Sequence, residues 1–130
     1  MKTSQFVNLT PHAIKLNCGV EFPPSGDVLR VSDTFHVDIV VSLETSNDPE
    51  SFAYRMPFYE VESSLSESDL PPFVMGTRYI VSAMALAAIK ALKCSRYDFV
   101  TPATGHPDCI RNEKGQIVSV PGFVRLGGAI

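Results

Sequence analysis

The stretch from Thr101 to Asn112 holds the densest group of side chains in this sequence that could bind a ligand. The candidates in it are Thr101, Thr104, Gly105, His106 and Arg111. Pro102 and Pro107 restrict the backbone between them, and a stiff loop loses less conformational entropy when a ligand binds. Threonine hydroxyls, backbone N–H groups beside a glycine and a guanidinium are groups that bind phosphate or carboxylate oxygens. The stretch therefore predicts a site for a small anion, and the alternative is a rigid connection whose polar groups satisfy only its own backbone.

Arg111 is the expected main anion contact of this loop. It immediately precedes Asn112-Glu113-Lys114-Gly115, a typical turn sequence, so its guanidinium could reach back over Thr104 and Gly105. The alternative is a structural ion pair with Asp98 or Asp108.

A second candidate corner comprises Asn8, Thr10 and His12, where an alternating apolar segment is broken by Thr10-Pro11. Its three polar side chains predict a further set of ligand contacts, and the alternative is an Asx or Thr turn with His12 simply exposed. A third and weaker candidate is Pro23-Pro24-Ser25-Gly26 together with Arg30, which could form a small anion nest.

Catalytic and metal-binding interpretations have less support in the sequence. His106 and Cys109 could begin a zinc site that Cys18 and His12 complete, but no paired ligand spacing accompanies them, so we expect no metal and no cofactor. Cys109 could be a nucleophile with His106 as its base, and the alternative is a small buried thiol. The sequence contains no GxSxG, Walker-type or HExxH motif. An enzyme is therefore the third interpretation, after two kinds of binding protein.

Composition limits the partners and the compartment. The chain has 130 residues with 45% hydrophobic and 19% charged residues, values typical of a folded single domain over residues 1–130. A formal net charge of -3 argues against a nucleic-acid polymer as partner, since such proteins need clustered Lys and Arg. No segment has the charge and apolar pattern of a leader or a membrane helix, so we expect a cytoplasmic protein without membrane contact. Three cysteines without CxxC spacing predict reduced thiols.

Short alternating segments predict a strand-rich fold that would position these candidates. Strands are expected at 5–9, 13–16, 20–22, 28–31, 37–41, 54–61, 77–81, 99–100 and 116–125, with a hairpin turn at Asn17-Cys18-Gly19. Polar stretches at Glu44–Ser51 and Glu62–Pro72 predict surface loops. Ala83–Lys93 is the one expected helix, with Ser82 as its N-cap, and its five alanines predict a largely buried helix packed closely on a sheet. The expected fold is an α/β domain of the α+β type, with a twisted, mainly antiparallel sheet carrying this helix.

Five segments carry a resemblance to a known family. They are VNLTPHAI at Val7–Ile14, PPSG at Pro23–Gly26, YIVS at Tyr79–Ser82, TPATG at Thr101–Gly105 and GQIV at Gly115–Val118. Together they span most of the chain. In the order and the residues of these segments, the sequence resembles a family of small uncharacterised proteins encoded by bacteria and their phages. The resemblance implies relatives but no particular activity.

These observations favour a binding protein that holds a small anionic metabolite or nucleotide without transforming it. Small phage proteins with a ligand pocket often sequester nucleotide immune signals, so a phage-type sponge for such a signal is the sharpest hypothesis, and it rests on analogy. The runner-up is a structural or interaction protein, such as a virion or assembly component, with a contact patch of Phe and Tyr residues near Phe52 to Tyr59. The sequence leaves assembly into a homo-oligomer open.

Overall fold

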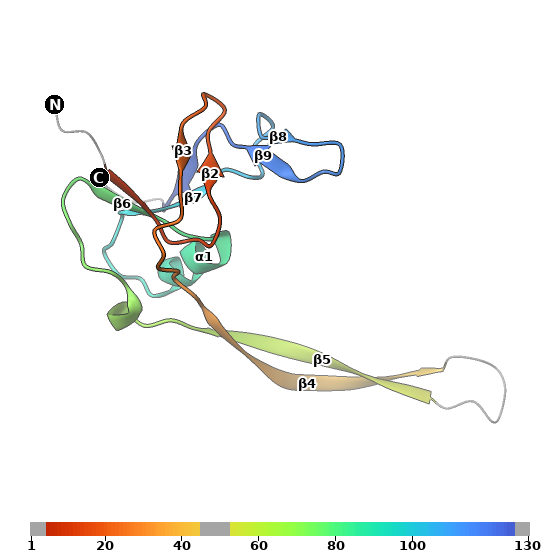
Figure 1. Ribbon diagram of the computed structural model, residues 1–130. Helices are drawn as coiled ribbons and strands as arrows, with labels where there is room; N and C mark the ends of the chain where they lie inside the picture. Colours follow the sequence, from red (N-terminus) through yellow and green to blue (C-terminus); the bar gives the residue numbers. More distant parts are fainter. Residues whose placement is uncertain (1–4, 45–52, 127–130) are drawn as a thin grey trace. The chain divides into compact units, whose positions relative to one another are not determined.

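The computed structural model describes residues 5–44 and 53–126 and shows an α+β fold rich in strands (Figure 1). Its contacts divide the chain into two units, of which one comprises the chain up to Val31 together with the chain from Leu65 onward, and the other is Ser32–Ser64. We describe each unit by itself. The second unit is a two-stranded hairpin, which has no core of its own, so a single domain over residues 1–130 stays a prediction.

A four-stranded sheet carries the first unit. Its strands, in spatial order, are β1 (Gln5–Asn8), β6 (Thr77–Ile80), β7 (Phe99–Pro102) and β10 (Phe123–Arg125). β1 and β6 run parallel, β6 and β7 run parallel, and β7 and β10 run antiparallel. The expectation of a mainly antiparallel sheet is therefore wrong for this sheet. The parallel pairing of β6 with β7 requires a crossover, and the helix between them supplies it.

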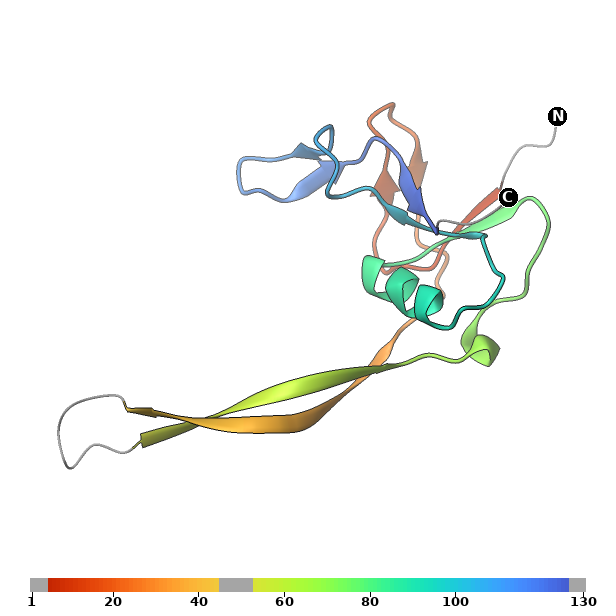
Figure 2. The ribbon, with the colours of Figure 1, turned by 180° about the vertical axis from the view of Figure 1, so that it is seen from behind.

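The helix α1 spans Ala83–Ala91 and lies against β6 and β7 (Figure 2). Ser82 is its N-cap, as expected, because its Oγ accepts a hydrogen bond of 3.1 Å from the backbone N–H of Ala85. Ala85, Leu86 and Ile89 are buried, whereas Met84 and Ala87 are exposed. The helix is thus one-sided, and the expectation that nearly all of it lies in the core is wrong.

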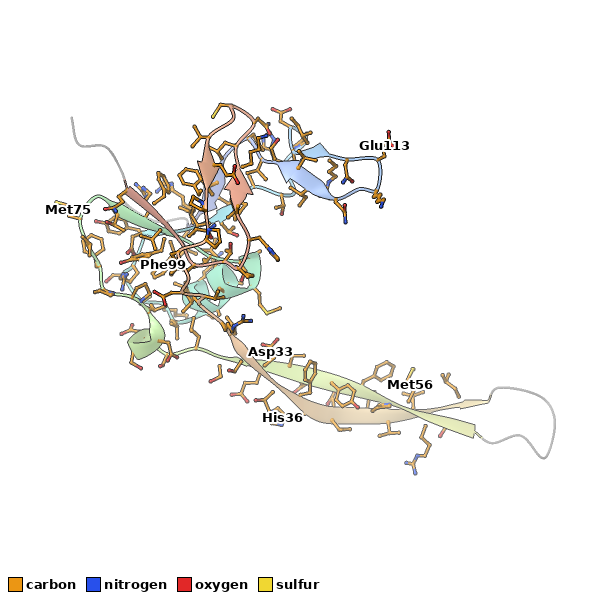
Figure 3. All side chains as sticks on the ribbon, in the orientation of Figure 1. Asp33, His36, Met56, Met75, Phe99 and Glu113 are labelled. Carbon is orange, nitrogen blue, oxygen red and sulfur yellow. The ribbon has the colours of Figure 1, made fainter. Side chains whose placement is uncertain are left out.

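The core of this unit forms where the buried face of α1 meets the sheet. Its buried members are Leu9, Leu65, Tyr79, Val81, Ala85, Leu86, Ile89 and Phe99. Phe99, labelled in Figure 3, is fully buried, and the Arg96 guanidinium lies 4.9 Å from its ring centroid. Arg96 also binds the buried Asp98 carboxylate through two hydrogen bonds of 2.9 and 2.7 Å. Hydrogen bonding to Asp98 raises the pKa of Arg96 above its ordinary value.

Two short hairpins extend from this sheet. β2 (Ile14–Lys15) and β3 (Glu21–Phe22) pair antiparallel, which confirms the hairpin expected around Asn17-Cys18-Gly19. β8 (Ile110–Arg111) and β9 (Ile117–Ser119) also pair antiparallel, and β8 was not expected. The single strand expected over residues 116–125 is two strands, β9 and β10. Pro121 lies between them and lacks the N–H that a continuous ladder would need.

The second unit is the antiparallel hairpin of β4 (Ser32–Glu44) and β5 (Ala53–Ser64). Both strands are longer than the expected segments at 37–41 and 54–61. Residues 62–64 therefore belong to β5 rather than to a loop, and the 3-10 helix η1 (Glu67–Asp69) follows. The loop expected at Glu44–Ser51 begins with a β4 residue, and the rest of it lies outside the described residues.

The segment Val28–Val31 is not a strand, which corrects the sequence-based expectation. Leu29 and Val31 pack against the core cluster, and the Leu29 N–H donates a single hydrogen bond of 3.1 Å to the Leu9 carbonyl. Its apolar side chains thus serve core packing without a strand ladder. In the part of the chain that the structure describes, no helix is long and apolar enough to cross a membrane.

The one-sided helix makes a testable contrast between two alanines. Ala85 has no exposed surface, so Ala85→Leu should overpack the core and lower the free energy of unfolding by about 1–3 kcal/mol. Ala87→Leu on the exposed side should change it by no more than about 0.5 kcal/mol. Urea denaturation of both variants measures this, and equal losses would contradict the orientation of α1.

Candidate functional site

A pocket of about 420 Å³ lies in the first unit, at the start of α1. Its lining comes from the corner after β1, from β2, from the first residue of α1 and its N-cap, from β7 and the residues after it, and from β9 and Val120. The polar lining residues are Thr10, His12, Lys15, Ser82, Thr101, Thr104 and Ser119. The volume falls within the range of small-molecule sites in proteins.

This pocket unites the two stretches that the sequence singled out separately. Thr10 and His12 come from the first stretch, and Thr101 and Thr104 come from the second, more than eighty residues later in the chain. Four of the eight predicted site residues therefore line one cavity. The other four, Asn8, Gly105, His106 and Arg111, do not line it.

Asn8 holds the Thr10–His12 turn at the pocket, because its buried side chain makes four hydrogen bonds. Its Nδ2 donates to the carbonyls of His12 at 2.8 Å and Phe22 at 3.0 Å. Its Oδ1 accepts from the Thr10 N–H at 2.9 Å and from the Thr10 hydroxyl at 2.6 Å. A primary amide can make no more than this, so Asn8 is a positioning residue in the folded chain. The Asx-turn alternative describes it correctly.

Thr101 is, with Ser119, one of the two buried polar residues that line the pocket. It lies in β7, only 7% of its surface is exposed, and its hydroxyl has no hydrogen-bond partner among residues 5–44 and 53–126. Buried hydroxyls are normally hydrogen-bonded. In the described chain, every fully buried side-chain nitrogen or oxygen atom has a hydrogen-bond partner. The Thr101 hydroxyl has none, so its oxygen is not fully buried and is accessible to water or a ligand.

The N-terminus of α1 contributes polarised backbone groups next to Thr101. Ser82 and Ala83 both line the pocket. The Ser82 hydroxyl already caps the Ala85 N–H, and the Ser82 carbonyl accepts from Leu86. The first N–H groups of a helix lack intrahelical acceptors, and the positive end of the helix dipole lies there. An anion bound beside Thr101 would lie near both features.

Charge on the pocket lining is of one sign. Lys15 and His12 are present, and none of the described residues that line the pocket carries a carboxylate, although the chain has 14 acidic against 11 Lys and Arg residues. Isoleucine and valine side chains of β2 and β9 form the apolar part of the lining, among them Ile14, Ile117 and Val118. The pocket thus combines an apolar surface with hydroxyls, an imidazole and the ammonium group of Lys15.

The loop residues outside the pocket are occupied by local bonds. The Arg111 guanidinium donates to the carbonyls of Gly115 at 2.9 Å and Thr104 at 3.1 Å, so it does reach back over Thr104. His106 Nδ1 accepts a hydrogen bond of 3.0 Å from the Asp108 N–H. The proposed pair of Arg111 with Asp98 is wrong, because Asp98 binds Arg96. A role for Arg111 as an anion contact stays a prediction.

Other candidates take structural positions. The Ser25 hydroxyl of the Pro23–Gly26 turn donates to the Asn8 carbonyl at 2.7 Å. Cys18, Cys94 and Cys109 are unpaired, and the Cys109 thiol contacts the Ser119 carbonyl at 3.4 Å. Within the described ranges, no cluster of three or more His, Cys, Asp or Glu side chains could hold a metal ion.

Sequence reasoning missed Lys15, Ser82 and Ser119 as pocket residues. Ser82 carried a signal, since it was recognised as an N-cap, but its position next to Thr101 follows from the pairing of β6 with β7. No family model matches this chain, and neither a curated protein nor a solved structure matches it. The family resemblance therefore stays a prediction.

The Asn8 network predicts a large difference between two asparagines. Asn8→Ala should lower the free energy of unfolding by about 1–3 kcal/mol, because it removes a buried amide and leaves two partly buried backbone carbonyls without this partner. Asn112→Ala is the matched control, since Asn112 also makes turn hydrogen bonds but is exposed, and it should cost less than about 1 kcal/mol. Chemical denaturation compares the two, and similar losses would contradict the structural role of Asn8.

Proposed function

We propose that this protein binds a small anionic ligand, of the nucleotide class, in the pocket between β2, β7, β9 and the N-terminus of α1, and that it does so without transforming the ligand. The observation that carries the proposal is the lining of the pocket. It contains five hydroxyl residues, Lys15, His12 and a helix N-terminus, and no carboxylate from the residues that the structure describes. In an acidic chain, this arrangement favours an anionic ligand over a cationic one.

The unpaired Thr101 hydroxyl adds a second argument. It belongs to a buried residue, it is itself accessible and it has no partner in the described chain, so it is able to donate a hydrogen bond to a phosphate or carboxylate oxygen. The apolar side chains of Ile14, Ile117 and Val118 would cover a base or another flat apolar group. A ligand with an anionic end and an apolar end satisfies both parts of the lining.

The sharpest form of the proposal is a sponge that sequesters a nucleotide immune signal, as small phage proteins with a ligand pocket often do. It rests on analogy and on the resemblance of the five sequence segments. Sequestration requires tight binding with no catalytic step, which is why the proposal assigns no catalytic residue. It also places the protein in the cytoplasm, where such signals occur.

Native mass spectrometry of the protein purified from its host cells would test the proposal directly. If the spectrum shows the chain with an added mass equal to a nucleotide or another small anion, the proposal is supported. If it shows the chain alone, calorimetric titration with AMP, ADP-ribose and cyclic dinucleotides follows. Absence of binding to every one of these probes in both experiments would overturn the nucleotide proposal.

Thr101→Val, compared with Arg111→Ala, separates the pocket from the part of the loop around Arg111 as the binding site. Valine has nearly the same shape, and the hydroxyl has no partner in the described chain, so the free energy of unfolding should change by less than about 1 kcal/mol. Affinity for the anion found above should fall roughly tenfold, the loss expected for one hydrogen bond to a charged group.

Arg111→Ala is the matched control for that experiment. Arg111 does not line the pocket, so this variant should keep its affinity and lose only the two exposed hydrogen bonds to Thr104 and Gly115. If Arg111→Ala weakens binding and Thr101→Val does not, the ligand lies on the loop and the pocket assignment is wrong. Calorimetric titration of both variants with the same anion provides the comparison.

The second candidate, an interaction or assembly protein, is favoured by a different observation. The β4–β5 hairpin carries exposed large apolar side chains on both strands, among them Phe35, Val37, Phe58 and Tyr59. Exposed apolar patches of this kind usually mark a contact with another protein. Part of the patch predicted near Phe52 to Tyr59 lies here, while Phe52 itself is outside the described residues.

A further inference from the structure

A second, smaller pocket adjoins the first one at the start of α1. It has a volume of about 230 Å³, and its lining comes from the corner after β1, from residues 28–31 and from the start of α1. Thr10 and Ser82 line both pockets. Sites for small molecules usually measure roughly 300–1,000 Å³, so the second pocket is small for a separate site. Its size and position are those of an extension of the first pocket.

The boundary that the two pockets share is open and carries unpaired donors. Ser82 is exposed and Thr10 is half-buried, so a ligand could cross these two residues without displacing the core. The Ser82 hydroxyl caps the Ala85 N–H, whereas the N–H groups of Ala83 and Met84 have no acceptor in the described chain. The unpaired hydroxyl of the buried Thr101 lines the first pocket, which also contains Ser82. Donors for an anionic group are therefore present at the boundary and next to it.

Each pocket also contains one permanent cation. Lys15 lines the first pocket and Arg30 lines the second, and neither side chain makes a hydrogen bond or an ion pair with the residues that the structure describes. None of the described residues that line the second pocket carries a carboxylate. With the positive end of the helix dipole at Ser82, these two cations favour negative charge where the pockets meet.

The rest of the second pocket is apolar. Its apolar lining residues are Leu9, Pro11, Val28, Leu29, Val31 and Met84. The hydrogen bond of 3.1 Å from the Leu29 N–H to the Leu9 carbonyl joins two of its segments. Met84 is 58% exposed although it belongs to this lining, and a flexible thioether side chain packs well on flat rings. The second pocket thus repeats the combination of the first, an apolar surface with one cation.

We infer that the two pockets form one site for a dinucleotide, a ligand with two nucleosides joined through phosphate groups. One nucleoside occupies each pocket, and the phosphates lie at the shared boundary over the start of α1, where Lys15 and Arg30 balance their charge. This inference rests on the proposed function and narrows its ligand class. A mononucleotide in the first pocket would leave Arg30 and Met84 without a ligand contact.

Calorimetric titration of the full chain with diadenosine diphosphate and with ADP tests this inference. Both probes have two phosphates, and ADP has the greater negative charge, so a preference for diadenosine diphosphate must come from its second nucleoside. We expect diadenosine diphosphate to bind at least roughly tenfold more tightly. Met84→Glu places a carboxylate in the second pocket and should abolish this preference. Ala87→Glu is the matched control, because it puts the same charge on the exposed side of α1 outside both pockets, and it should keep the preference.

Arg30→Ala provides a second test that does not depend on the helix. It should weaken the binding of diadenosine diphosphate roughly tenfold, the loss expected for a hydrogen bond to a charged group. Arg55→Ala removes the same charge from a residue that lines neither pocket, and it should leave the affinity unchanged. Thermal melting of each variant shows whether the fold is retained.

The outcomes separate this inference from the proposed function. If ADP binds as tightly as diadenosine diphosphate, or if the preference survives Met84→Glu, the two-pocket site is wrong while a nucleotide site in the first pocket stands. Unchanged affinity for diadenosine diphosphate in Arg30→Ala also overturns the inference. Binding of neither probe overturns it as well, and the titrations with AMP, ADP-ribose and cyclic dinucleotides then decide the proposed function.

Discussion

The amide of Asn8 is the interaction on which the pocket of this protein depends. It lies at the end of β1, and its four hydrogen bonds hold the turn at Thr10 and His12 and also the carbonyl of Phe22 in β3. The Asn8 carbonyl in turn accepts from Ser25. One buried polar side chain thereby connects the edge of the main sheet to the β2–β3 hairpin. A network that satisfies every donor and acceptor is rigid, whereas a partly satisfied one would be costly in the interior.

The parallel pairing of β6 with β7 makes the second contribution to the site. Because the strands run in the same direction, α1 must cross between them, and its N-terminus then lies where β6 ends. β7 pairs with β6 as far as Val100, so Thr101 follows at the same end of the sheet. Ser82 and Thr101, which are far apart in sequence, therefore reach one pocket. The carboxyl ends of parallel strands are a common location for ligands for this geometric reason.

Part of this arrangement could be predicted from the sequence. The features that could be predicted depend on residues close together in the chain, and the others depend on residues far apart. The Ser82 cap, the Asn17–Gly19 hairpin and the turn before Gly115 depend on neighbouring residues, and each was predicted correctly. The mixed sheet depends on which distant strands pair, which alternation within a strand does not encode. Val28–Val31 looked like a strand because its residues favour sheets, but core packing determines its place. Asn8 was recognised as a polar corner, yet whether its amide faces a ligand or the backbone depended on the position of Phe22.

Polar and apolar groups are unequally distributed between the two units, and this bears on what each one does. In the first unit an interior forms and polar groups such as Asp98 and Asn8 are paired inside it. In the hairpin, aromatic and β-branched side chains are exposed although they are as apolar as the core residues of the first unit. Exposing such side chains is unfavourable in water, and two strands alone cannot bury both faces.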